Sequence, residues 1–93
     1  MVQFDLAEAI LSLKTRAEVD AFLADLCTPS EVRAFQERWL VAQLLDQGEL
    51  SYRDIAKKAD SSTATVVRIA RFLNDMPYKG YRRVIDRLQG ARR

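Results

Sequence analysis

Apolar side chains recur at helical spacing along most of this 93-residue chain, and the pattern predicts about six α-helices. The first helix is expected at about Leu6–Leu13, with Asp5 as its N-cap. The second is expected at about Arg16–Leu26, where Thr15 and Glu18 form the capping-box pattern. No β-strand is predicted, so the expected fold class is all-α.

The third predicted helix is the longest in the chain and runs from Pro29 to about Gln47. Its start signal combines Thr28 as N-cap, Pro29 at the first helical position and Glu31 at the third. Gly48 follows the helix, where a positive φ costs a glycine little. Apolar residues lie on more than one side of this helix, which indicates a central element packed by other helices or by a second subunit.

Residues 51–73 predict two short helices joined by a sharp turn, the pattern of a helix-turn-helix. The first is expected at about Tyr52–Ala59, and the second from after Ser62 to about Leu73. Two helices that cross near a right angle need a small residue where they touch, and Ala56 supplies one. The apolar residues expected to face inward are Ile55, Ala56, Ala59, Val66, Ile69, Ala70 and Leu73.

The surface left over on these two helices is small, rich in hydroxyls and basic at its edges. A helix that enters the major groove of DNA needs such a surface, because hydroxyls meet base edges and phosphates while cations flank them. We expect phosphate contacts from Arg53, Lys57, Lys58 and Arg71. The candidate DNA-binding residues are Arg53, Lys57, Lys58, Asp60, Ser61, Ser62, Thr63, Ala64, Thr65, Val67, Arg68 and Arg71.

The turn and the end of the second helix have distinctive residues. Asp60 stands where a glycine is frequent in this motif, and Ser61 stands where an apolar residue is common. Asp tolerates the left-handed region better than most residues, so the turn remains compatible with the motif. Asn74 and Pro77 are expected to end the second helix, and a last helix is expected at about Tyr78–Leu88.

Length and composition limit the architecture and the chemistry. Residues 1–93 are expected to form a single DNA-binding domain, with dimerisation helices at about 5–47, the helix-turn-helix at about 51–73 and a C-terminal helix at about 77–89. We read no membrane span and no signal peptide, so a cytoplasmic location is expected. One cysteine, Cys27, and no histidine exclude a zinc site and Ser-His or Cys-His catalysis. We therefore expect neither enzyme activity nor a cofactor.

Charge is divided unevenly along the chain. Residues 1–50 hold four Lys/Arg against nine Asp/Glu, a balance of −5, whereas residues 51–93 hold eleven against four, a balance of +7. The positive charge is thus concentrated where the helix-turn-helix lies. Such a patch supplies most of the sequence-independent affinity for nucleic acid.

Several motifs of this chain resemble the tryptophan repressor family. They are Thr28-Pro29 with Glu31, Arg38, the block LLDQGELSYRDI and the segment ATVVR of the second helix-turn-helix helix. They lie within CTPSEVRAFQERWLVAQLLDQGELSYRDIAKKADSSTATVVRIARFLNDMP. The likeness covers about residues 26–90 without gaps and is nearest to the repressor-like branch called YerC/YecD. The first two helices are only loosely similar.

The resemblance implies an all-α, intertwined homodimer in which the N-terminal helices of one chain wrap the other. It implies a sequence-specific regulator of transcription, expected to be a repressor, whose partner is double-stranded DNA. The positions matching the operator-contacting region of the family are Arg53, Lys57, Asp60 to Thr65, and Val67.

The resemblance fails at the ligand pocket of the family. Arg38 and Arg68 match two arginines that flank the bound tryptophan, but the Gly and Ser that complete the pocket are replaced by Ile69 and Phe72. These larger side chains are expected to fill the space of an indole. We therefore expect a vestigial pocket and no response to tryptophan, and a different, unknown small-molecule effector stays open as the less favoured alternative. Arg38 is free to pair with Glu37 or Asp46 instead.

Two other interpretations remain open from sequence. The helix-turn-helix pattern is compatible with an ordinary helical hairpin that has a solvated polar face. The basic half of the chain is compatible with an all-helical module that binds an acidic protein or RNA. An enzyme is the weakest alternative, because caps and helix faces account for the carboxylates.

Overall fold

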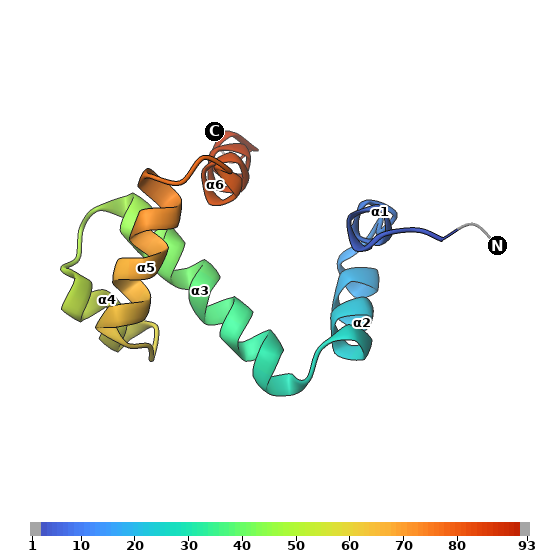
Figure 1. The fold of residues 1–93 in the computed structure, drawn as a ribbon, viewed down its shortest axis with the longest axis horizontal. Helices are drawn as coiled ribbons and strands as arrows, with labels where there is room; N and C mark the ends of the chain where they lie inside the picture. The colour runs from blue at the N-terminus through green and yellow to red at the C-terminus, as the bar shows by residue number, and fades with distance from the viewer. Residues whose placement is uncertain (1–2, 92–93) are drawn as a thin grey trace. The chain divides into compact units, whose positions relative to one another are not determined.

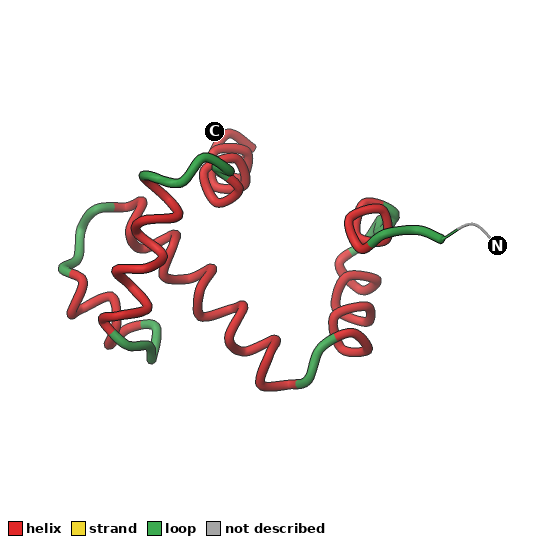
Figure 2. Tube along the Cα trace, viewed as in Figure 1, coloured by secondary structure: helices red, strands yellow, loops and turns green. Residues whose placement is uncertain are grey.

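A computed structural model describes residues 3–91 of the chain, which form six α-helices and contain no strand (Figures 1 and 2). This confirms the predicted all-α class. In chain order the helices are α1 (Leu6–Leu11), α2 (Arg16–Leu26), α3 (Pro29–Gln47), α4 (Tyr52–Lys58), α5 (Thr63–Asn74) and α6 (Gly80–Ala91).

Side-chain caps start these helices, among them the predicted caps at Asp5, Thr15 and Thr28. The Asp5 carboxylate and the Thr15 and Ser51 hydroxyls each accept a backbone N–H three residues ahead. At α3 the capping box is reciprocal: the Glu31 N–H donates to the Thr28 hydroxyl over 3.2 Å, and the Thr28 N–H donates to the Glu31 carboxylate over 2.8 Å. The hydrogen bond with the Thr28 backbone lowers the pKa of Glu31 below its usual value, and the hydrogen bond with the Thr28 side chain adds a smaller effect in the same direction.

Three helix boundaries differ from the sequence prediction by two or three residues, among them the end of α6, which lies at Ala91 instead of near Leu88. α1 ends at Leu11 instead of near Leu13, because the Ser12 hydroxyl donates to the Ala9 carbonyl over 2.6 Å and closes the helix early. α6 begins at Gly80, after the predicted start, because Lys79 has a φ of +56° that an α-helix cannot contain.

The chain divides into two compact units. The first, Met1–Arg33, contains α1, α2 and the first turn of α3. The second, Ala34–Arg93, contains the rest of α3 with α4, α5 and α6. The candidate DNA-binding residues therefore all belong to the second unit.

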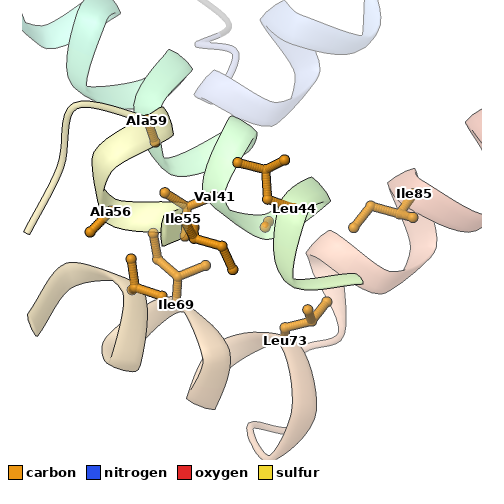
Figure 3. Packing of buried hydrophobic residues seen from close by; sticks show 10 residues of the cluster. Val41, Leu44, Ile55, Ala56, Ala59, Ile69, Leu73 and Ile85 are labelled. Carbon is orange, nitrogen blue, oxygen red and sulfur yellow. The ribbon is translucent and has the colours of Figure 1, made fainter. Parts of the chain in front are cut away.

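The hydrophobic core lies in the second unit, where side chains from α3, α4, α5 and α6 meet (Figure 3). Val41, Ile55 and Val66 are its largest fully buried side chains. Every residue expected to face inward from the helix-turn-helix is buried, which confirms the helical periodicity of that stretch. The remaining members of the cluster are Ala42, Leu44, Ala56, Ala59, Ile69, Leu73 and Ile85.

The first unit has apolar side chains but no buried residue in α1 or α2. Leu6, Ile10 and Leu26 are each at least half exposed, and Leu11 is more so. An exposed apolar surface of this extent is uncommon on a monomer.

Candidate nucleic-acid interface

The turn between α4 and α5 is a C-terminal helix cap of the Schellman type. The Ser61 N–H donates to the Ala56 carbonyl over 2.8 Å, and the Asp60 N–H donates to the Lys57 carbonyl over 3.3 Å. Asp60 has a φ of +52°, the left-handed conformation that this motif requires. Asp60 thus occupies the glycine position of the turn, as its place in the sequence suggested.

Replacing Asp60 with glycine is expected to raise the free energy of unfolding by about 0.5–1 kcal/mol, because glycine adopts a positive φ without steric cost. Asp60→Val should lower it, since a β-branched residue fits this conformation poorly. Urea denaturation followed by circular dichroism measures both changes. Asp54→Gly, within α4, is the matched control and should lose stability. A loss for Asp60→Gly as well would contradict the assignment of the turn.

The buried side of α5 determines which of its residues face outward. Val66, Ile69, Ala70 and Leu73 are buried against α3, α4 and α6, so the positions between them turn outward. Ala56 is 6% exposed on the facing surface of α4, where a small side chain lets the two helices approach. The core therefore holds the outer face of α5 in one orientation.

The structure places the candidate DNA-binding residues on this outer surface. All of them are exposed except Ser61 and Thr65, which are half-buried. Val67, the apolar member of the set, is 47% exposed. None of the ion pairs among residues 3–91 involves Arg53, Lys57, Lys58 or Arg71. These four cations are therefore available to phosphates.

The hydroxyls of this surface have different tasks. Ser62 caps α5: its oxygen accepts the Thr65 N–H over 3.1 Å, and its hydroxyl contacts that of Thr65 over 3.0 Å. Within the described residues, the hydroxyls of Ser61 and Thr63 make no hydrogen bond. Thr63 is the fully exposed one of the two. The sequence does not distinguish these hydroxyls. In the structure, Thr63 has the hydroxyl that is both exposed and without a hydrogen bond among the described residues.

A cavity of about 660 Å³ opens in the second unit between α3, α5 and the start of α6. Arg38, Arg68, Ile69 and Phe72, which the sequence grouped as a vestigial pocket, all lie in its lining. Ile69 is only 3% exposed and packs into the core, and Phe72 forms part of the wall. Both side chains thus border this space, and their exclusion of an indole from it stays a prediction.

Other cavity walls were missed by the sequence analysis. They come from α3 and from the segment that enters α6: Trp39, Met76, Tyr78, Lys79, Gly80, Tyr81 and Val84, with Thr65 of α5. The indole of Trp39 stacks on the ring of Tyr81 with centroids 6.4 Å apart. Helical spacing does not distinguish a core contact from a cavity wall, so the sequence did not reveal this role for either residue.

Among residues 3–91, Arg38 is paired with none of the carboxylates considered for it. Its guanidinium lies over the ring of Phe35, 5.6 Å from the centroid, and it makes no ion pair with Glu37 or Asp46. Arg68 lies in the same way over Phe72, at 5.9 Å. Both arginines are held by aromatic faces, which leaves their charges uncompensated by carboxylates.

Two helices joined by a Schellman turn, with one exposed basic and hydroxyl-bearing helix, define the helix-turn-helix class of DNA-binding proteins. The sequence profile of the Trp repressor protein family matches residues 3–89. The chain belongs to this family, which consists of DNA-binding regulators and not of enzymes.

Two relatives extend this comparison. A Bacillus subtilis protein described as "Uncharacterized protein YerC" is 37% identical over 84 residues, covering 90% of this chain and 79% of the relative. The crystal structure of a TrpR-like protein from Eubacterium eligens superposes with a TM-score of 0.84 at 43% identity, covering 90% of this chain and 84% of that one. The resemblance seen in the sequence, including the YerC branch, is confirmed.

Proposed function

We propose that this protein is a sequence-specific regulator of transcription, a repressor, that acts as a homodimer through its helix-turn-helix. The observation that carries the proposal is the outer face of α5. Its side chains are exposed, while the opposite face of the same helix is buried in the second unit and holds the helix in place. The charge balance of +7 in residues 51–93 supports a polyanionic partner. The partner is double-stranded DNA, and the protein acts in the cytoplasm.

The homodimer is supported by the apolar surface of the first unit. Neither α1 nor α2 buries a side chain within one chain, although each carries an apolar stripe. A second copy that covers these stripes would complete their burial, so we propose that residues 5–47 form the dimerisation part of a single functional domain. Two copies would present two α5 helices to one duplex, which requires a two-fold symmetric site.

We propose that the exposed cations hold phosphates and that the start of α5 reads bases. Arg53, Lys57 and Lys58 of α4 and Arg71 of α5 supply the cations. Thr63 is the principal base-reading hydroxyl, and Ala64 and Val67 offer apolar contact of the kind that a thymine methyl accepts. Ser62 contributes by capping α5.

Selection of bound sites from a random duplex pool tests the proposal. A consensus made of two inverted half-sites is expected, about one helical turn apart or a multiple of it. Thr63→Val should then change the base preference at one position of each half-site, while a random duplex binds as before. Enrichment of no consensus would reject sequence-specific recognition.

The cavity is not proposed to bind tryptophan. In the family resemblance a Gly and a Ser complete the tryptophan pocket, and Ile69 and Phe72 replace them here. The space that remains therefore lacks the hydroxyl that holds the amino group of the ligand. Isothermal titration with L-tryptophan should show no micromolar binding, and micromolar binding would contradict the prediction.

A further inference from the structure

Asp46 joins α3 to α6 through both of its carboxylate oxygens. Oδ1 lies 2.7 Å from Nη1 of Arg82, and Oδ2 accepts a hydrogen bond from Nε2 of Gln89 over 3.0 Å. Arg82 and Gln89 are seven residues apart, so they lie on one side of α6 two turns from each other. One carboxylate thus spans two turns of the neighbouring helix.

The position of Asp46 has no local explanation. It lies in the last turn of α3, which contains no basic residue, and the negative end of a helix disfavours a carboxylate. Its side chain is only 14% exposed. A charge held there must be compensated by its tertiary partners. Hydrogen bonds from Arg82 first to Asp46 and then to Asp86 raise the pKa of the arginine, which keeps it positive.

α6 has little other anchorage in the second unit. Ile85 is its only buried side chain, while Val84 and Leu88 are about half exposed. The stacking of Tyr81 on Trp39 adds one aromatic contact. Among residues 3–91, no other side-chain hydrogen bond or ion pair joins residues more than four positions apart. The contacts of Asp46 therefore supply a large part of what holds α6 against α3.

The docking of α6 is connected to α5. Ile85 belongs to the same hydrophobic cluster as Ile69 and Leu73 of α5 (Figure 3). Tyr81 and Val84 line the same cavity as Arg68, Ile69 and Phe72 of α5. If α6 moved away, the C-terminal half of α5 would lose its cover, and the direction of the whole helix would be less well defined.

We propose that Asp46 is a positioning residue that clamps α6 onto α3 and thereby sets the affinity of α5 for DNA. The effect on DNA affinity rests on the proposed function, whereas the clamp between α3 and α6 does not. The clamp gives Asp46, Arg82 and Gln89 a role in DNA binding although none of them belongs to the exposed surface of the helix-turn-helix.

The pair Asp46→Asn and Asp86→Asn tests the clamp. Both variants remove one negative charge that contacts Arg82, but Asp86 lies on the same helix as Arg82, at 3.2 Å, and is 58% exposed. Asp46→Asn removes the charge that compensates Arg82, and with the Gln89 amide oriented as it is, the one remaining acceptor oxygen can meet Arg82 or Gln89. Trp39 is the only tryptophan of the chain and stacks on Tyr81, so its fluorescence reports the docking of α6.

Asp46→Asn is expected to shift Trp39 emission to longer wavelength and to weaken binding to the selected duplex roughly threefold to tenfold. Asp86→Asn should leave the emission unchanged and bind equally or more tightly, since losing a negative charge favours DNA. This difference between the two variants separates positioning from charge. Gln89→Ala changes no charge, so a smaller loss in the same direction supports the clamp even if Asp46→Asn folds poorly.

Equal behaviour of Asp46→Asn and Asp86→Asn in both measurements, with Gln89→Ala unchanged, would overturn the proposal. A red shift without any loss of DNA affinity would overturn its DNA part. If the wild-type chain binds no selected duplex at all, the proposed function fails. The Trp39 emission of the three variants then decides by itself whether Asp46 holds α6.

Discussion

Replacing Ala56 with leucine is expected to destabilise the protein by about 1–3 kcal/mol and to reduce DNA affinity at least tenfold. Ala56 is 6% exposed and lies in the core cluster where α4 faces α5. Three additional carbon atoms have no space there, so the helices must separate or adopt strained rotamers. Because the backbone carbonyl of Ala56 also closes the turn through Ser61, the displacement reaches the start of α5.

Ala64→Leu is the matched control, because it adds the same atoms on the exposed side of α5. It should leave the free energy of unfolding within about 0.5 kcal/mol of the wild type. Its DNA affinity should nevertheless fall, since the larger side chain lies on the proposed contact surface. Urea denaturation and duplex binding measure the two effects separately. If Ala56→Leu were as stable as Ala64→Leu, α4 and α5 would not be packed through Ala56.

The local structure of this chain could be read from its sequence because the signals are short-range. Caps at Thr28, Ser51 and Ser62 act within three residues, and the buried positions of α5 repeat at helical spacing. These contacts do not depend on how distant parts of the chain pack. The predicted bounds of α2 and α3 agree with the structure for the same reason.

The tertiary details could not be read in this way. The left-handed conformation at Lys79, which delays the start of α6, has no signal in its side chain. Asp46 did carry a signal, since a carboxylate in the last turn of a helix needs compensation, but its partners are more than 30 residues away. Likewise, the sequence shows the volumes of the Ile69 and Phe72 side chains but not their directions, so it did not reveal that both border a cavity.

The affinity for DNA is expected to fall by about 10⁴-fold between about 50 and 200 mM salt, if a dimer neutralises roughly eight phosphates. The number follows from four unpaired cations on each copy: Arg53, Lys57, Lys58 and Arg71. Each neutralised phosphate releases condensed counterions, and added salt opposes that release. Fluorescence anisotropy with the selected duplex, repeated over a salt series, gives the slope.

Lys57→Ala removes two of these contacts from a dimer and should reduce the slope of log affinity against log salt by about two. Binding to the selected duplex and to a random duplex should be weakened equally, because phosphate contacts are the same for every base sequence. Lys14→Ala, an exposed lysine of the first unit, is the control and should leave the slope unchanged. Thr63→Val should show the reverse behaviour, with an unchanged slope and a reduced preference for the selected site. Equal slopes for Lys57→Ala and Lys14→Ala would mean that the exposed face of α4 does not lie against the DNA backbone.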